Sequence, residues 1–74
     1  MKNLRINPVD LARYYRRDTA AVKMVHIPTQ VSTRWFAASK KRAKNEDEAL
    51  VNLKEKLLSE IYKGNIQGKG LLDE

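Results

Sequence analysis

Few side chains in this sequence could do chemistry on a substrate. His26 is the single histidine and cysteine is absent, which rules out disulfides and thiolate metal sites and argues against a histidine-based zinc site. Asp18 is the acid nearest to His26 in the sequence, and Asp10 and Asp18 are spaced to cap local structure rather than to form an acid pair. We therefore interpret His26 as a structural residue and expect no enzymatic activity, no cofactor and no metal site.

Positively charged side chains offer a second kind of chemistry, the binding of anions. Arginine pairs with phosphate in a bidentate way, and aromatic rings stack on unpaired bases. At least one of the aromatic residues near the charges is expected to lie in the core instead. The sequence predicts a surface for RNA or an acidic partner, made of Arg13, Arg16, Arg17, Lys40, Lys41, Arg42 and Lys44, with Tyr14, Tyr15 and Trp35 as possible stacking or contact residues.

The charge is unevenly distributed along the 74 residues, whose formal net charge is +6. Residues 1–44 carry eleven Lys or Arg against two Asp or Glu, whereas residues 45–74 carry four against seven. A basic half favours RNA, an anionic lipid surface or an acidic protein face as partner; the other interpretation is a solvated surface that keeps a small protein soluble. An alternative is a binder of any acidic surface that acts through charge alone, with a steep salt dependence.

Alternation of side chains predicts a β-hairpin in the middle of the chain. Residues 20–27 alternate as a strand, and Pro28 begins a turn because proline fixes φ and donates no hydrogen bond. Residues 31–36 are the second strand. Trp35 and Phe36 are consecutive in it, so they are expected on opposite faces.

Helices are expected on both sides of this hairpin. Asn7 can cap a helix and Pro8 suits its first position, which predicts a short helix over about residues 8–17. An apolar stripe predicts a long helix over residues 46–62, beginning as early as Ser39. Asn45 with Glu48 looks like a capping box at the start of this helix; its C-cap signal is Gly64-Asn65.

These elements indicate an α+β fold, in which a small antiparallel sheet packs against one long C-terminal helix, with a short N-terminal helix. Leu4-Arg5-Ile6 is expected to add a short strand. Residues 1–63 are expected to form a single domain and residues 64–74 a flexible tail. No apolar run approaches the roughly 20 residues that cross a bilayer. We therefore expect a cytoplasmic protein that does not span a membrane.

Several short strings have the order and spacing of a known family. The strings are Ala21-Val22-Lys23, His26-Ile27-Pro28-Thr29, Lys44-Asn45, Ala49-Leu50, Leu53-Lys54 and Lys56-Leu57. With them, over about residues 16–60 and with a small insertion before Lys44, the chain resembles the catalytic domain of bacterial class I peptide chain release factors. That resemblance implies a strand, a His-Ile-Pro-Thr turn, a further strand and a basic stretch leading into a long helix, on a domain that docks on ribosomal RNA.

The chain departs from that family where the family does its chemistry. Alignment back from Ala21-Val22 puts Leu11-Ala12-Arg13 in the place of the Gly-Gly-Gln loop that hydrolyses peptidyl-tRNA. Leu11 and Ala12 lack the backbone freedom of glycine, and Arg13 is not an amide. The resemblance therefore implies a release-factor-like frame that binds without catalysis, with the ribosome or other RNA as partner.

A protein adaptor is the alternative that reuses the same frame. Release-factor-like chains of this size without Gly-Gly-Gln are similar to the small lysis-inhibition accessory proteins of T-even-type phages. This weaker resemblance rests on Tyr14-Tyr15-Arg16-Arg17 and Thr33-Arg34-Trp35-Phe36. It implies an adaptor that binds the cytoplasmic part of a holin or antiholin, in the cytoplasm of a bacterial host cell if the chain is phage-encoded.

Overall fold

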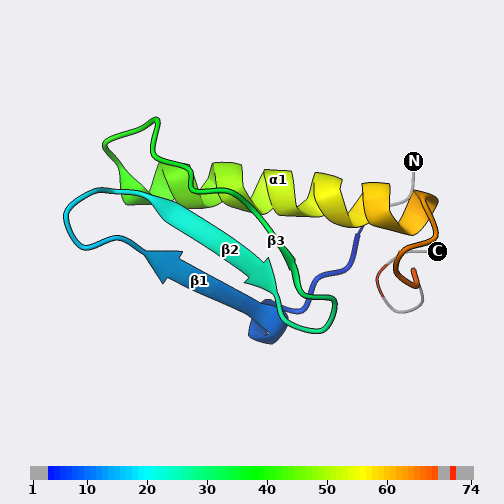
Figure 1. Cartoon of the computed structure of the whole chain (residues 1–74). Coiled ribbons are helices and arrows are strands. Elements are labelled where there is room, and N and C mark those ends of the chain that lie inside the picture. Colours follow the sequence, from blue (N-terminus) through cyan, green and yellow to red (C-terminus); the bar gives the residue numbers. More distant parts are fainter. Residues whose placement is uncertain (1–3, 69–70, 72–74) are drawn as a thin grey trace.

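The computed structural model describes residues 4–68 and 71, which form one sheet and one long helix (Figure 1). A three-residue 3-10 turn, Pro8–Asp10, precedes strand β1, Leu11–Tyr15. Strand β2, Val22–His26, and the short strand β3, Val31–Ser32, follow, and helix α1 runs over Arg42–Tyr62. The strands pair antiparallel in the order β1-β2-β3, so the expected α+β architecture is confirmed.

β2 is the central strand because it pairs with β1 on one edge and with β3 on the other. Its alternate residues have opposite surroundings. Val22, Met24 and His26 are buried against α1, whereas Lys23 and Val25 are half-buried on the other face. The predicted hairpin is confirmed, with Val25 opposite Ser32, but its second strand, expected over residues 31–36, is only Val31–Ser32. Gln30 closes its turn at φ 61°, and its N–H donates to the carbonyl of His26.

The helix expected over residues 8–17 is the main correction to the sequence prediction. Asn7 does cap, because its Oδ1 accepts the N–H of Val9 at 3.2 Å, but it caps only the turn Pro8–Asp10. β1 follows at once and pairs along its whole length with β2, from Leu11 opposite His26 to Tyr15 opposite Val22. The backbone groups that β1 directs toward β2 are therefore paired in the sheet, and the side chains of β1 follow a period of two instead of 3.6.

The first expected strand, Leu4-Arg5-Ile6, is reduced to one β-bridge residue, Leu4. The N–H of Arg5 donates to the carbonyl of Leu71 at 2.6 Å, so the two ends of the described chain meet.

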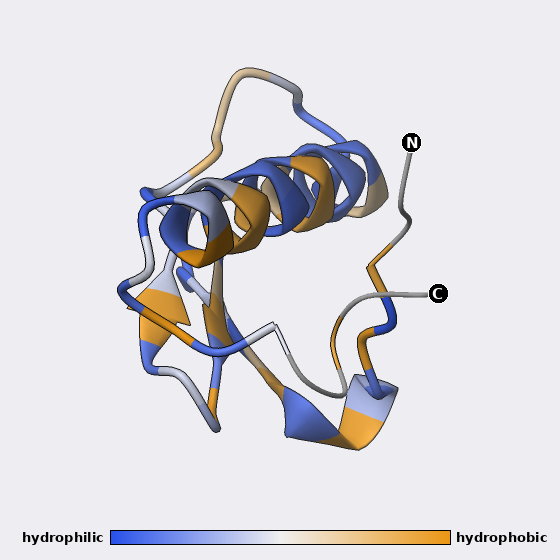
Figure 2. Ribbon diagram, turned by 90° about the vertical axis from the view of Figure 1, so that its right-hand side faces the viewer, coloured by the Kyte–Doolittle hydropathy of each residue, from blue (hydrophilic) through white to orange (hydrophobic). Residues whose placement is uncertain are grey.

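α1 lies across one face of the sheet and leaves the other face open, as the view in Figure 2 shows. Asn45, Ala49, Leu53 and Leu57 recur every four residues and are fully buried. The buried stripe of α1 therefore follows these four positions, while Leu50 and Ile61 are half-buried. Together with Val22 and Met24 of β2, the three apolar residues of this stripe form the core.

The C-terminal end of α1 has the predicted cap. Gly64 adopts φ 79°, and the N–H groups of Gly64 and Asn65 donate to the carbonyls of Ile61 and Glu60. This pattern is a Schellman motif, in which glycine takes the left-handed position without a Cβ penalty. Of the tail expected from residue 64 on, residues 69–70 and 72–74 lie outside the described part. Ile66 packs against the core.

Among the described residues, no helix combines the length and the apolar character that crossing a membrane requires.

Candidate nucleic-acid interface

The fold brings the two basic clusters of the sequence to the same end of the molecule. The loop between β1 and β2 and the segment before α1 lie beside each other at the start of α1, on the left in Figure 1. Asn45 of α1 contacts both of them. All the charged residues involved are exposed. We call this set the basic end: Arg16, Arg17, Lys40, Lys41, Arg42 and Lys44.

The start of α1 adds a partial positive charge to the basic end. Lys41 occupies the N-cap position and its side chain makes no capping hydrogen bond, and the first turn contains no acidic residue. The first N–H groups of a helix have no partner within the helix, and the helix dipole places about half a positive charge there. An anion at this end therefore meets backbone donors as well as Lys and Arg side chains.

Asn45 holds the basic end together, and the sequence prediction of its role is wrong. It lies inside the first turns of α1, fully buried, instead of capping the helix. Its Nδ2 donates to the carbonyls of Ala20 and Ser39 at 2.8 and 2.9 Å, and its Oδ1 accepts the N–H of Ser39 at 3.0 Å. One amide therefore ties both basic loops to the helix.

The register of β1 divides the first basic cluster between the two faces of the sheet. Arg13 points to the α1 face, where its Nε lies 2.6 Å from a carboxylate oxygen of Glu46. Tyr15 lies on the same face beneath the guanidinium of Arg42, which is 5.0 Å from the ring centroid. Tyr14 and Arg16 alternate with these residues and belong to the open face. Arg13 is thus held in an ion pair beside the basic end rather than within it.

A bulge places Trp35 on the open face. Thr33 is hydrogen-bonded to Met24 and Phe36 to Val22, so that Arg34 and Trp35 together stand opposite Lys23. The Oγ1 of Thr33 fixes this bulge, since it accepts the N–H of Met24 at 3.0 Å and donates to the carbonyl of Arg34 at 2.8 Å.

Trp35 and Phe36 point to opposite faces, as predicted. Phe36 packs against the core beneath the guanidinium of Arg34, which is 4.9 Å from its ring centroid. Trp35 instead lines a shallow hollow of about 330 Å³ on the open face. We call it the open-face hollow; its walls are Tyr14, Lys23, Val25, Gln30, Ser32 and Trp35.

His26 lies at the far end of β2, away from the basic end. It is 1% exposed, and its Nδ1 is 2.8 Å from the Oγ1 of Thr29, which ties the strand to the following turn. Its Nε2 is buried and has no hydrogen-bond partner among the described residues. Within that same part of the chain, no three His, Asp or Glu side chains come together as they would around a metal ion.

Comparisons with protein-family models, curated proteins and solved structures give no match. The site must therefore be interpreted from its own geometry and chemistry.

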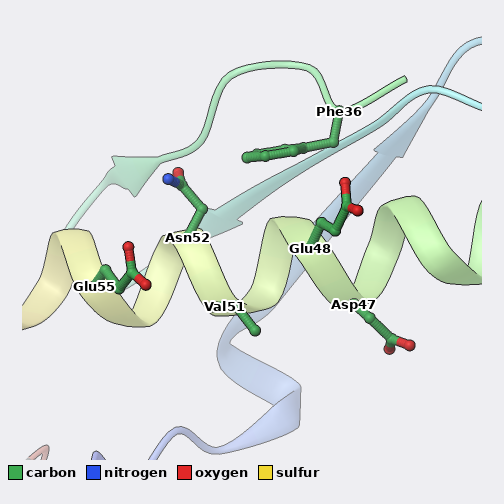
Figure 3. Close-up of a pocket in the computed structure, with 6 residues that line it drawn as sticks. All are labelled: Phe36, Asp47, Glu48, Val51, Asn52 and Glu55. Carbon is green, nitrogen blue, oxygen red and sulfur yellow. The ribbon is translucent and has the colours of Figure 1, made fainter. Parts of the chain in front are cut away.

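A second surface, which the sequence analysis missed, lies on the side of α1. It is an open groove of about 370 Å³ in which the Phe36 ring lies across the helix above Glu48 and Asn52 (Figure 3). Most of its lining is apolar, and Val51 in its wall is 56% exposed. We call it the acidic groove because three of its six residues are acids; it is lined by Phe36, Asp47, Glu48, Val51, Asn52 and Glu55. The acidic run after Asn45 is a sequence feature that could have indicated this groove. The position of Phe36 over the groove depends on the bulge, which the sequence does not show.

Proposed function

We propose that this chain is a non-catalytic, release-factor-like module that binds RNA, ribosomal RNA among the candidates, through its basic end. The observation that carries the proposal is the convergence of two basic clusters, separate in the sequence, around a helix start that has no side-chain cap and no acid in its first turn. Phosphate groups are recognised by Lys, Arg and helix N-termini in this way. The chain would act in the cytoplasm, with no chemistry of its own.

A charge reversal at Lys40 and Lys41 tests the proposal. The double variant Lys40→Glu/Lys41→Glu should lose most RNA binding, and the slope of log K against log salt should fall by about 1.5, because each phosphate contact contributes roughly 0.7–0.9 to that slope. The measurement is fluorescence anisotropy with labelled RNA over a salt series, together with co-sedimentation with ribosomes.

The test separates binding from folding. Glutamate beside a helix N-terminus is favourable by about 0.3–1 kcal/mol, so the variant should be at least as stable as the native chain. Lys54→Glu/Lys63→Glu is the matched control, since it makes the same charge change on two exposed residues away from the basic end, one within α1 and one at its C-cap. Equal loss of RNA binding in both double variants would show that only net charge matters and would contradict a defined basic end.

The acidic groove favours a second candidate function, that of a protein adaptor. Its apolar floor and three carboxylates would suit a segment with an apolar residue flanked by Lys or Arg. This chemistry differs from the acidic partner expected from the basic half of the sequence. A cytoplasmic segment of a holin or antiholin remains the partner in the phage version of this proposal.

The two candidate functions make opposite predictions for paired variants. Asp47→Lys/Glu55→Lys should weaken binding of synthetic peptides from holin or antiholin cytoplasmic segments at least tenfold, while RNA binding is kept. Lys40→Glu/Lys41→Glu should do the reverse. Isothermal titration of both variants with both ligands checks this. Peptide binding that is insensitive to the groove variant would rule out the adaptor site.

A further inference from the structure

The open-face hollow has a composition that the proposed function does not explain. Sheet faces exposed to water usually carry polar residues, yet this one presents two aromatic rings with a lysine between them. We propose that the hollow binds an unpaired base of single-stranded RNA. The proposal rests on RNA binding by the basic end and adds the class of RNA that the chain selects.

The aromatic residues lie where a base could stack. Tyr14 is 51% exposed, so about half of its surface is open to solvent. Lys23 is its register partner on β2, and Trp35 stands on the other side of Lys23 at the bulge. With strands about 4.8 Å apart, the two aromatic positions flank Lys23 across the width of the sheet. A base that stacks on Tyr14, beside Trp35, lies next to Lys23, whose ammonium group can pair with the phosphate of that nucleotide.

Arg16 connects the hollow with the basic end. Its guanidinium covers Trp35 at 4.6 Å from the ring centroid, a cation–π contact that holds the indole in place. Arg16 itself belongs to the loop that carries Arg17 and that Asn45 ties to the start of α1. One strand of RNA can therefore place a base in the hollow and its next phosphates on the basic end.

This arrangement favours single strands over duplexes. In an RNA duplex the faces of the bases are covered by their neighbours in the stack, so only the phosphates are available to this surface. Aromatic stacking on an unpaired base contributes to affinity without regard to sequence. The basic end can therefore bind the phosphates of single-stranded and duplex RNA, whereas the open-face hollow can bind a base of single-stranded RNA only.

Trp35 gives a direct readout because it is the only tryptophan in the chain. Titration of the native protein with a uridine oligomer of about ten nucleotides, within the usual size of such sites, should quench Trp35 fluorescence. A blunt RNA duplex of similar charge should bind with little quenching. Tyr14→Ala should weaken binding of the uridine oligomer about 5- to 150-fold, the range expected for loss of one stacking ring, and leave duplex affinity within twofold.

Tyr62→Ala is the matched control, because Tyr62 is also exposed but lies at the opposite end of α1. It should leave both affinities unchanged. Single-stranded RNA that binds without quenching Trp35, or a Tyr14→Ala variant that loses both RNAs equally, would overturn the proposal and leave the hollow to a protein side chain. Absence of binding to either RNA would overturn the proposed function as well, so the two failures are distinguishable.

Discussion

At the scale of single residues, Asn45 links the fold to the candidate interface. A buried polar side chain is costly unless its donors and acceptors are paired, and Asn45 pairs both its amide oxygen and its amide nitrogen. Its partners are backbone groups of Ala20 and Ser39, next to the basic loops. The spacing between these loops therefore depends on a side chain that is itself fully buried.

Replacement of Asn45 by alanine should destabilise the chain. Asn45→Ala would leave the carbonyl of Ala20 and both backbone groups of Ser39 without their partners, at a cost of about 2–4 kcal/mol. Urea unfolding followed by circular dichroism measures this. Asn52→Ala, in the same helix and only half-buried, should change stability by less than about 0.5 kcal/mol and is the control. Similar values for both variants would contradict the linking role of Asn45.

The role of Asn45 could not be read from its sequence neighbourhood. The string Asn45-Glu46-Asp47-Glu48 has the spacing of a capping box, so local chemistry favoured a helix start at that point. In the structure α1 begins earlier, at Arg42. Asn45 therefore lies within the helix, and its side chain points toward the two loops that it joins. Only contacts distant in sequence distinguish the two outcomes.

At the scale of elements, the strand at β1 shows where pattern reasoning fails. Asn7 and Pro8 are a sound helix start, and they do form the turn that was expected of them. The five residues that follow are too few to separate a period of two from one of 3.6. Pairing with β2 decides the matter, and it moves Tyr14 and Tyr15 to opposite faces of the sheet. α1 and β2 were predictable because each is long or regular enough to carry its own signal.

The contrast between local and long-range signals also explains which residues of the candidate site could be predicted. Charged clusters are visible in any sequence, so the residues of the candidate basic end could be singled out before their geometry was known. The open-face hollow was found only in part, since Tyr14 and Trp35 were singled out but Lys23 was not. Its assembly needs three strands and a bulge, and a bulge leaves little trace in a sequence.

At the scale of the whole molecule, a small core supports both surfaces. Five fully buried apolar residues from β2 and α1 hold the sheet and the helix together. A chain of this length has a stability of roughly 4–11 kcal/mol. One large-to-small substitution in the core therefore removes much of the free energy of unfolding.

A substitution of Leu53 tests how much of the unfolding free energy depends on the core. It is fully buried at the centre of the stripe on α1, so Leu53→Ala should lower the unfolding free energy by about 2–5 kcal/mol. Val51→Ala, 56% exposed two residues earlier, should change it by less than about 0.5 kcal/mol. Thermal unfolding by circular dichroism measures both. A small effect of Leu53→Ala would mean that the helix does not depend on the sheet for its stability.

The bulge at Arg34 and Trp35 also determines how the open face of the sheet tolerates the loss of a residue. Because Arg34 and Trp35 share one place opposite Lys23, removal of either one restores a regular ladder and keeps Phe36 on the core side. A chain without Arg34 would still present an indole to the open face, and a chain without Trp35 would present a guanidinium there. A one-residue deletion, which in most strands turns the remaining side chains to the wrong face, would here exchange one binding chemistry for another. The bulge is thus a place where shortening of the chain can change recognition without loss of the fold.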